Sequence, residues 1–369
     1  MRLLLTSLLM PALAMGCGDD DKSSDSDGVV YETNCEALAS LFVTDAVDSV
    51  DDWTGYWLCF EEENNCSGPE CTWEPDDLDD YVLSETCADA GSCTIDGETI
   101  EECQSIENTG FVTVDCDADG EISITANGLP GHTFENYALS GELPPLLGSA
   151  ESNATYTLST SPVYSGESDV FATGGGTAAV AVNGVSLFNQ FTGTGTVAVT
   201  DETVDDCGGH PANGTYHYHA FPECGELAND DRVGAEGLHS GLVGLSLDGF
   251  PILGPYGHDN PSDLGSDIVR LESCYALTEC ADDTDSSCYV FDGDAYSAGT
   301  CHLDECNGRI TAVPSALQAA LGDEIYAYHM TVDADGGPAF PYQPYCYRGE
   351  VETTSGTGPG PGAGPPKSG

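Results

Sequence analysis

Three of the chain's histidines stand in one short segment, His210 to His219, which reads His-Pro-Ala-Asn-Gly-Thr-Tyr-His-Tyr-His. Asn213-Gly214 is the strongest two-residue signal for a β-hairpin, because a type I′ turn needs positive φ at both central positions. Such a turn places His217 directly opposite His210, and His219 shares its face of the strand. Opposed Cβ atoms lie about 4.5–5.5 Å apart, so these imidazoles can reach one ion at about 2 Å from each nitrogen.

The same alternation of His and Tyr also suits a buried strand whose ring nitrogens bind backbone groups or Tyr hydroxyls. The scarcity of histidine favours the metal interpretation, since the whole chain has eight and three of them are here. Nitrogen ligands suit copper or zinc, whereas calcium and magnesium prefer oxygen. We therefore predict a copper or zinc site of three histidines plus a water, a tyrosine or a carboxylate.

Composition excludes several classes of partner. The 369 residues include 64 acidic and 7 basic ones, for a formal charge of −57. Nucleic acid and anionic membrane surfaces would be repelled by such a chain. No dinucleotide fingerprint, phosphate-binding Gly loop, nucleophile elbow or Ser-His-Asp order is present, so neither nucleotide binding nor nucleophilic hydrolysis is supported. A solvated acidic surface is the simplest interpretation of the charge.

The first 28 residues indicate export. Residues 1–16 have Arg2 and then an apolar run from Leu3 to Leu13, which is typical of a signal peptide and too short for a membrane span. The segment resembles a bacterial lipoprotein signal in which Cys17 is lipidated and becomes the mature N-terminus. Residues 17–28 form an acidic tether. We expect an envelope protein, attached to the outer membrane or cell surface by its lipid, or extracellular.

Cysteine usage agrees with an oxidising compartment. The chain has 17 cysteines, and setting Cys17 aside leaves sixteen, an even number. Eight of them lie in residues 35–116 and eight in residues 207–346. This division predicts two self-contained sets of disulfides. Spacing does not settle the connectivity, although we favour a bridge from Cys207 to Cys224 because these residues flank the histidine hairpin.

The remaining pattern is mainly that of a β protein. Residues 29–116 form a cysteine-rich acidic module with one candidate helix at residues 35–47, and residues 117–352 form the main domain, with a candidate helix at residues 314–321. Short alternating strands predict an antiparallel sandwich or a barrel-like fold. The expected strands are Phe111–Val114, Glu121–Thr125, Ala154–Leu158, Ala178–Val182 and Gly195–Val199. Residues 353–369 are Gly/Pro-rich and expected to be disordered.

An acidic stretch between the first two strands resembles half of a calcium loop. Asp115, Asp117 and Asp119 alternate and are followed by Gly120. The position that needs a bidentate Glu holds Ala126 instead. Calcium is therefore a possible ligand, and an acidic hairpin turn is the alternative that we favour.

Several ordered blocks resemble the YHYH-domain family, over roughly residues 122–350. Gly241 and Leu245 depart from the Pro and the aromatic residue that members often have there. The matching blocks are Asn127–His132, Val182–Asn189, Asp206–His210, Tyr216-His217-Tyr218-His219, His239-Ser240, Asp248–Gly257, Leu303–Gly308, Tyr326–His329, Phe340–Tyr342 and Cys346–Gly349. The family occurs in secreted and surface proteins, and its biochemical role is not settled.

The resemblance nominates further ligands because most histidines lie in or beside its blocks. His132, His239 and His329 are the candidates for a fourth ligand. Asp248 is a ligand, an acceptor that orients a ligand His, or simply the residue that caps an Asp-Gly turn. Three classes of function remain open: a lipid-anchored copper or zinc protein, a metal-dependent enzyme, and a non-catalytic surface or adhesion module with structural His and Tyr.

Overall fold

The computed structural model describes residues 29–44, 112–117, 120–128, 130, 154–166, 176–201, 204–205, 207–212, 215–222, 224, 227, 234, 237–278 and 283–351, together with short strands elsewhere. These short strands are β2 (Trp57–Cys59), β3 (Leu83–Ser84), β4 (Cys93–Ile95), β5 (Glu98–Ile100), β6 (Cys103–Ser105), β11 (Asp169–Val170) and β25 (Ser355–Gly356). The expected signal, tether and most of the cysteine-rich module and tail lie outside the described residues. The chain is mainly β, as its alternating pattern predicts.

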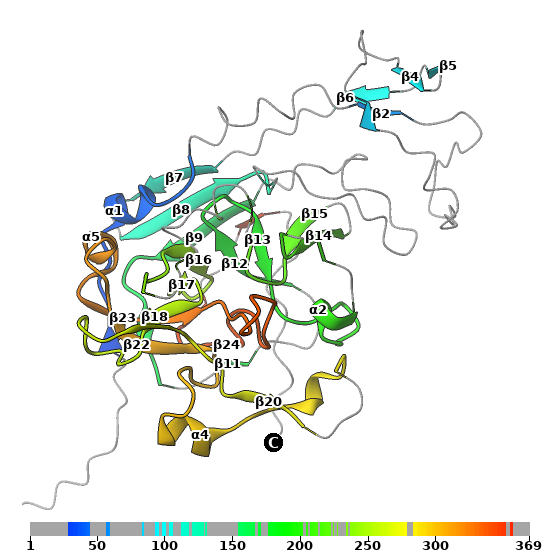
Figure 1. Cartoon of the computed structure of the whole chain (residues 1–369). Coiled ribbons are helices and arrows are strands. Elements are labelled where there is room, and N and C mark those ends of the chain that lie inside the picture. The colour runs from blue at the N-terminus through cyan, green and yellow to red at the C-terminus, as the bar shows by residue number, and fades with distance from the viewer. Residues whose placement is uncertain are drawn as a thin grey trace, which may run out of the picture.

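The centre of the molecule is an open eight-stranded sheet with the order β14-β15-β13-β12-β16-β17-β23-β22 (Figure 1). Most neighbours are antiparallel, but β13 with β15 and β17 with β23 are parallel. The sheet is therefore mixed and does not close into a barrel. Its strands are β12 (Thr177–Ala181), β13 (Ser186–Phe188), β14 (Gly209–Ala212), β15 (Thr215–Tyr218), β16 (Leu242–Ser246), β17 (Pro251–Leu253), β22 (Gly308–Ala312) and β23 (Glu324–His329).

The sheet has an internal pseudo-two-fold axis. The strand pairs follow the same sequence from either edge of the sheet. Each edge begins with an outer antiparallel hairpin, which is followed by a parallel strand pair, an inner antiparallel hairpin and then the central pair β12–β16. At the centre, β12 and β16 pair Val180 with Leu245. The pairs on either side, Ala179 with Ser246 and Ala181 with Gly244, exchange places under the two-fold rotation. We call β12 to β15 the first half-sheet, and β16, β17, β22 and β23 the second half-sheet.

Backbone hydrogen bonds repeat the same symmetry in the two inner turns. Gly184 has φ 81° and donates its N–H to Ala181 O at 2.9 Å. Gly249 has φ 83° and donates to Ser246 O at 2.9 Å. Glycine adopts this left-handed conformation without the steric cost of a Cβ. The expected Asp-Gly turn after Asp248 is thereby confirmed.

A second sheet packs against the first and has the order β25-β9-β8-β7. It contains β7 (Val112–Cys116), β8 (Glu121–Ala126) and β9 (Ala154–Ser159). Buried and partly exposed residues alternate along β8 and β9, so one face joins the apolar core shared with the eight-stranded sheet. Tyr156 and Ser186 also hydrogen-bond across the two sheets at 2.8 Å. Four of the five expected strands are confirmed here and in β12.

The fifth expected strand, residues 195–199, is wrong. Val197 makes one isolated bridge to Phe191, and its N–H bonds to Thr284 O at 2.8 Å. The chain then turns into helix α2 (Ala198–Asp201), in which Asp201 N–H bonds back to Val197 O. Alternation over so few residues is weak information, and the contact to the distant loop decided the conformation.

Helices α1 (Cys35–Ala39) and α5 (Gln318–Leu321) lie side by side at one end of the sheets (Figure 1). Asn34 caps α1 by accepting the Ala37 N–H at 3.2 Å. Both helices occur within the segments predicted for them, but each is shorter than predicted. Leu38 of α1 and Val112 of β7 belong to the main core, so both ends of the cysteine-rich segment pack against the main domain.

A long insertion separates β17 from β22 in the second half-sheet. It contains two small antiparallel hairpins and short helices: β18 (Tyr256–His258), β19 (Ile268–Arg270), β20 (Tyr275–Leu277), the 3-10 helix η4 (Ser286–Cys288), β21 (Tyr289–Phe291) and α4 (Gly293–Ala298). The remaining short pairs are β1 (Val29–Val30) with β10 (Val163–Tyr164), and β11 with β24 (Cys346–Tyr347).

Four disulfides are described, and each joins cysteines of one predicted set. They are Cys35–Cys116, Cys207–Cys224, Cys274–Cys301 and Cys306–Cys346. The favoured bridge beside the histidine hairpin is confirmed. None of the described helices combines the length and apolar character that a membrane crossing requires.

Candidate metal centre

The outer hairpin of the first half-sheet brings the three histidines together. Its register pairs His210 with His217 and Ala212 with Thr215, as the Asn-Gly turn predicts. His210 Nε2 lies 3.1 Å from His217 Nε2, which lies 3.0 Å from His219 Nε2. All three side chains are buried, with 2–3% of their surface exposed. The turn therefore converts sequence spacing into a compact group of imidazole nitrogens.

The spacing of these nitrogens fits one small cation. Two ligands that are each about 2.0 Å from an ion, at a tetrahedral angle, lie about 3.3 Å apart. The two measured separations are close to this value. Within the described part of the chain, these residues are the only group of three or more His, Cys, Asp or Glu whose ligand atoms lie close enough together to hold a metal. The donor set is all nitrogen, which suits copper or zinc.

Neighbouring groups orient the imidazoles. His219 donates its Nδ1–H to Asn189 O at 2.9 Å, which directs its Nε2 lone pair at the other two rings. Phe188 stacks on His217 with ring centroids 3.8 Å apart. Burial, followed by the neighbouring His210, lowers the pKa of His219 to about 3. His219 is therefore neutral near pH 7, and neutral imidazole is the form that binds metals.

A buried carboxylate fixes the start of the hairpin. Asp205 accepts the backbone N–H groups of Cys207 at 2.9 Å and Gly209 at 3.0 Å, and the hydroxyl of Tyr216 at 2.7 Å. An added Cβ on Gly209 would lie 2.6 Å from the Tyr216 hydroxyl, so a larger residue would displace this contact. The two tyrosines of the motif point away from the histidine face, and Tyr218 accepts a hydrogen bond from Asn183 at 3.0 Å.

The other histidines predicted as ligands either lie away from the cluster or are not among the described residues. His132 is not among the described residues. His329 belongs to β23 in the second half-sheet, and its Nδ1–H is donated to Gly254 O at 2.9 Å. His239 lies beside His258, with ring centroids 5.3 Å apart. The structure thus gathers three of the predicted histidines and places His329 in the second half-sheet and His239 in the segment just before β16.

Asp248 is the centre of a separate hydrogen-bond network. Its Oδ2 accepts the hydroxyl of Tyr328 at 2.6 Å and the backbone N–H groups of Arg348 at 3.1 Å and Gly349 at 2.9 Å. Burial raises the pKa of Asp248, while these donors act in the opposite direction. The residue closes the turn after β16 and ties it to the C-terminal segment.

The acidic stretch with the calcium-like pattern forms the β7–β8 hairpin. Asp115 pairs with Ser123, and Asp117 accepts the Glu121 N–H at 3.0 Å while Gly120 has φ 87°. Asp119 lies outside the described residues. The acidic hairpin interpretation is confirmed, and calcium binding stays a prediction.

Sequence reasoning assigned no role to Phe188, Asn189 and Asp205. Phe188 and Asn189 end one of the family-like blocks, and Asp205 begins an Asp-x-Cys-x-Gly pattern. The same pattern recurs at Asp304, where the carboxylate accepts the corresponding N–H groups. This repetition is the signal that could have revealed the carboxylate before the structure.

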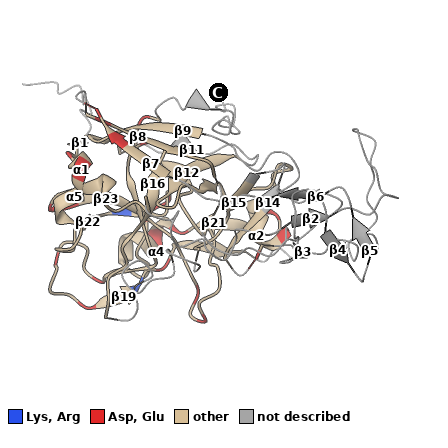
Figure 2. Ribbon diagram, turned by 90° about the horizontal axis from the view of Figure 1, so that it is seen from above, with Lys and Arg blue, Asp and Glu red and all other residues tan. Residues whose placement is uncertain are grey.

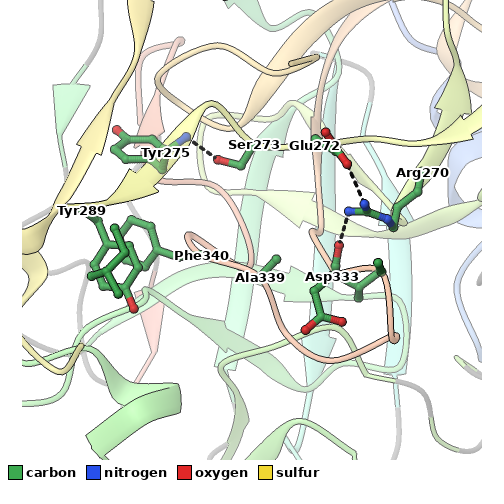
Figure 3. Close-up of a pocket in the computed structure, with 11 residues that line it drawn as sticks. Arg270, Glu272, Ser273, Tyr275, Tyr289, Asp333, Ala339 and Phe340 are labelled. Atoms are coloured by element: carbon green, nitrogen blue, oxygen red, sulfur yellow. Dashed lines mark hydrogen bonds and ion pairs between the residues drawn. The ribbon is translucent and has the colours of Figure 1, made fainter. Parts of the chain in front are cut away.

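A separate cavity of about 300 Å³ lies beside the insertion (Figure 3). Tyr289 stacks on Phe340 at 3.9 Å along one wall, and Tyr275 packs edge-on against the same ring. On the other side, Arg270 is bound to Glu272 at 2.6 Å and to Val332 O at 2.8 Å. None of the three clustered histidines lines this cavity.

Comparison with known proteins identifies a family and nothing more specific. No curated protein and no solved structure matches the chain. The family model described as YHYH protein matches residues 155–349, which is more than half of the chain and contains both half-sheets. The Tyr-His-Tyr-His segment whose histidines form the cluster lies within this match, and the chain belongs to the YHYH protein family.

Proposed function

We propose that this protein is a metal-binding protein whose His210, His217 and His219 together hold one copper or zinc ion. The observation that carries the proposal is the convergence of three buried Nε2 atoms at separations of 3.0 and 3.1 Å. One proton on a ring nitrogen can form a good hydrogen bond to only one neighbour. A cation can accept lone pairs from all three nitrogens at once, so it accounts for the arrangement better than packing alone.

The donor chemistry restricts the metal. Three imidazoles without a carboxylate in the group favour copper or zinc over calcium or magnesium. The strongly acidic chain also raises the local concentration of cations near its surface. The aromatic ring of Phe188 shields one side of the cluster, which leaves less water to compete for the nitrogens.

Export and lipid attachment belong to the same proposal. Four described disulfides support an oxidising compartment, and the signal-like residues 1–16 followed by Cys17 support an anchor. Replacing Cys17→Ser should move the protein from the membrane fraction to the soluble fraction. If the Cys17→Ser variant stays in the membrane fraction, the lipid anchor is contradicted. That outcome does not bear on metal binding, which is tested separately.

Metal binding is tested by titrating metal-free folded protein with Cu(I), Cu(II) and Zn(II). We expect one equivalent to bind, and we expect His217→Ala and His219→Ala each to weaken binding at least tenfold. His302→Gln is the matched control, because it removes a histidine from the insertion rather than from the cluster. If the parent binds no metal, or if both cluster variants bind as the parent does, the histidines are core residues of a non-catalytic surface module.

A further inference from the structure

The second half-sheet carries a counterpart of the histidine cluster with different side chains. Arg309 pairs with Ala327 across the β22–β23 hairpin as His210 pairs with His217 across the β14–β15 hairpin. His329 lies two residues beyond Ala327 and corresponds to His219. Asp304 binds the N–H groups of Cys306 and Gly308 as Asp205 does in the first half-sheet. The scaffold is therefore repeated, and one of its three histidines is retained.

The retained imidazole is oriented in the same way as its counterpart. His329 donates Nδ1–H to Gly254 O at 2.9 Å, and Gly254 is the two-fold equivalent of Asn189. Its other nitrogen, Nε2, is fully buried and has no hydrogen-bond partner among the described residues. A buried lone pair without a donor is costly, so this nitrogen favours a ligand that supplies a proton or an equivalent electrophile.

Arg309 places a buried positive charge at this position. Basic residues occur at only a few places on the ribbon (Figure 2), and those in the described part of the chain are Arg270, Arg309 and Arg348. Arg270 pairs with Glu272 and Arg348 with Asp304, whereas Arg309 forms no ion pair with a described residue. It is only 4% exposed.

One nitrogen of the Arg309 guanidinium is buried and forms no hydrogen bond with a described residue. Nη2 donates to His258 O at 2.7 Å, and Nε is buried without a described partner. The carboxylate that acts on Arg309 most strongly is Asp259, which is 64% exposed and faces His302 at 3.6 Å. A buried guanidinium of this kind requires a counter-anion to offset its desolvation.

A second imidazole lies at the same place. His239 donates Nδ1–H to Ser240 O at 2.7 Å, and its Nε2 is buried without a described partner. Gly257 lies against both the guanidinium and this imidazole. A Cβ on Gly257 would lie 2.7 Å from Arg309 Nη2 and 3.5 Å from His239 Nε2.

We propose that Arg309, His329 and His239 form a binding site for a small oxyanion that carries one acidic proton, such as hydrogen phosphate or hydrogen carbonate. The anionic oxygen accepts from Arg309 Nε, and the O–H donates to an imidazole Nε2. A metal cation is disfavoured because the guanidinium would repel it. A water molecule could satisfy one nitrogen, but it would bring no negative charge to the buried guanidinium. The site does not depend on metal binding at the first half-sheet.

The test is calorimetric titration of the folded, metal-free full chain with inorganic phosphate and, separately, with hydrogen carbonate. At least one of these anions should bind with a stoichiometry of one, and the tighter one identifies the preferred geometry. Arg309→Gln should weaken that binding at least tenfold. The matched control is Arg270→Gln, which removes an equal charge from an ion-paired side chain and should leave the affinity within twofold of the parent.

A second variant keeps the test valid if Arg309→Gln does not fold. Gly257→Ala retains every charge and places a methyl group between the guanidinium and His239, so it should also weaken binding at least tenfold. The proposal is overturned if neither anion binds the parent, if Arg270→Gln and Arg309→Gln lose equal affinity, or if the folded Gly257→Ala protein binds as the parent does.

Discussion

The two half-sheets share a scaffold but present different side chains on it. In each, a buried Asp binds two N–H groups at the start of the outer hairpin, and a tyrosine hydroxyl donates to the same carboxylate. In each, a histidine is oriented by a backbone carbonyl of the neighbouring parallel strand. The two hairpin positions beside this histidine differ: they hold His210 and His217 in the first half-sheet, and Arg309 and Ala327 in the second.

The comparison separates what builds the site from what selects its ligand. The Asp, the Tyr and the carbonyl hold the hairpin and aim one imidazole, and they are kept in both halves. The two variable positions are those of His210 and His217 in the first half-sheet and of Arg309 and Ala327 in the second. They decide whether the oriented imidazole lies beside two more imidazole nitrogens or beside a guanidinium. Lone pairs attract a cation, and a guanidinium attracts an anion, so one scaffold can serve opposite charges.

Acid should give the largest effect, because it acts on both half-sheets together. Burial lowers the pKa of His219 to about 3 and of His239 to about 4, and it lowers that of His329 as well, against about 6.5 in an unfolded chain. Below about pH 6.5 the unfolded chain binds more protons at these histidines than the folded chain does. The free energy of unfolding therefore has its full value above about pH 6.5 and falls as the pH drops toward about 4. The loss is about 2 kcal/mol per histidine at pH 5.

Urea denaturation of metal-free protein at pH 7.5 and pH 5 measures this loss. Equal stability at both values would mean that the histidines are protonated in the folded state, and the shared burial of the two halves would be wrong.

The two equivalent carboxylates should differ in their contribution to stability. Asp304 also forms a buried ion pair with Arg348 at 2.8 Å. Asp304→Asn removes the buried charge partner of that guanidinium, which keeps only the half-exposed Glu305 at 3.4 Å, and should lower the free energy of unfolding by about 3–5 kcal/mol. Asp205→Asn removes acceptors for N–H and O–H donors and should cost about 1–3 kcal/mol. Urea unfolding of both variants ranks them, and the reverse order would contradict the description of the scaffold.

Converting the second half-sheet to the first is the next test. The double variant Arg309→His and Ala327→His restores three imidazoles around the scaffold, and copper or zinc stoichiometry should rise from one to two per chain. Arg309→His alone supplies only two hairpin imidazoles and is the control. A stoichiometry that stays at one in a folded double variant would show that the scaffold alone does not create a metal site.

The smallest expected effect concerns the ring beside His217. Phe188 stacks on this imidazole at 3.8 Å, and Leu253 occupies the equivalent position in the second half-sheet. Phe188→Leu should weaken metal binding by about two- to twelvefold, since such aromatic contacts contribute about 0.5–1.5 kcal/mol. Competition titration against a chelator resolves a change of this size, and an unchanged affinity would show that the ring only fills space.

Much of the site follows from local sequence. Asn213-Gly214 predicts a two-residue hairpin turn, and the register that this turn implies for His210 and His217 is the register of the β14–β15 hairpin. Alternation likewise identified the strands β8 and β9. The recurrence of Asp-x-Cys-x-Gly and of Tyr-x-Tyr-His was also present in the sequence, and it marks the two equivalent hairpins.

Tertiary structure alone decided which distant residues meet. His239 and His329 are as close to family blocks in sequence as the clustered histidines, yet His239 lies just before β16 and His329 in β23, near Arg309 rather than near the cluster. The strand predicted from alternation over residues 195–199 also does not form. Val197 there donates its N–H to Thr284 O, in a distant loop, and the chain turns into α2. The physical reason is that a hairpin fixes its register through adjacent backbone hydrogen bonds, whereas the placement of one hairpin relative to another depends on burial of their faces in a common core.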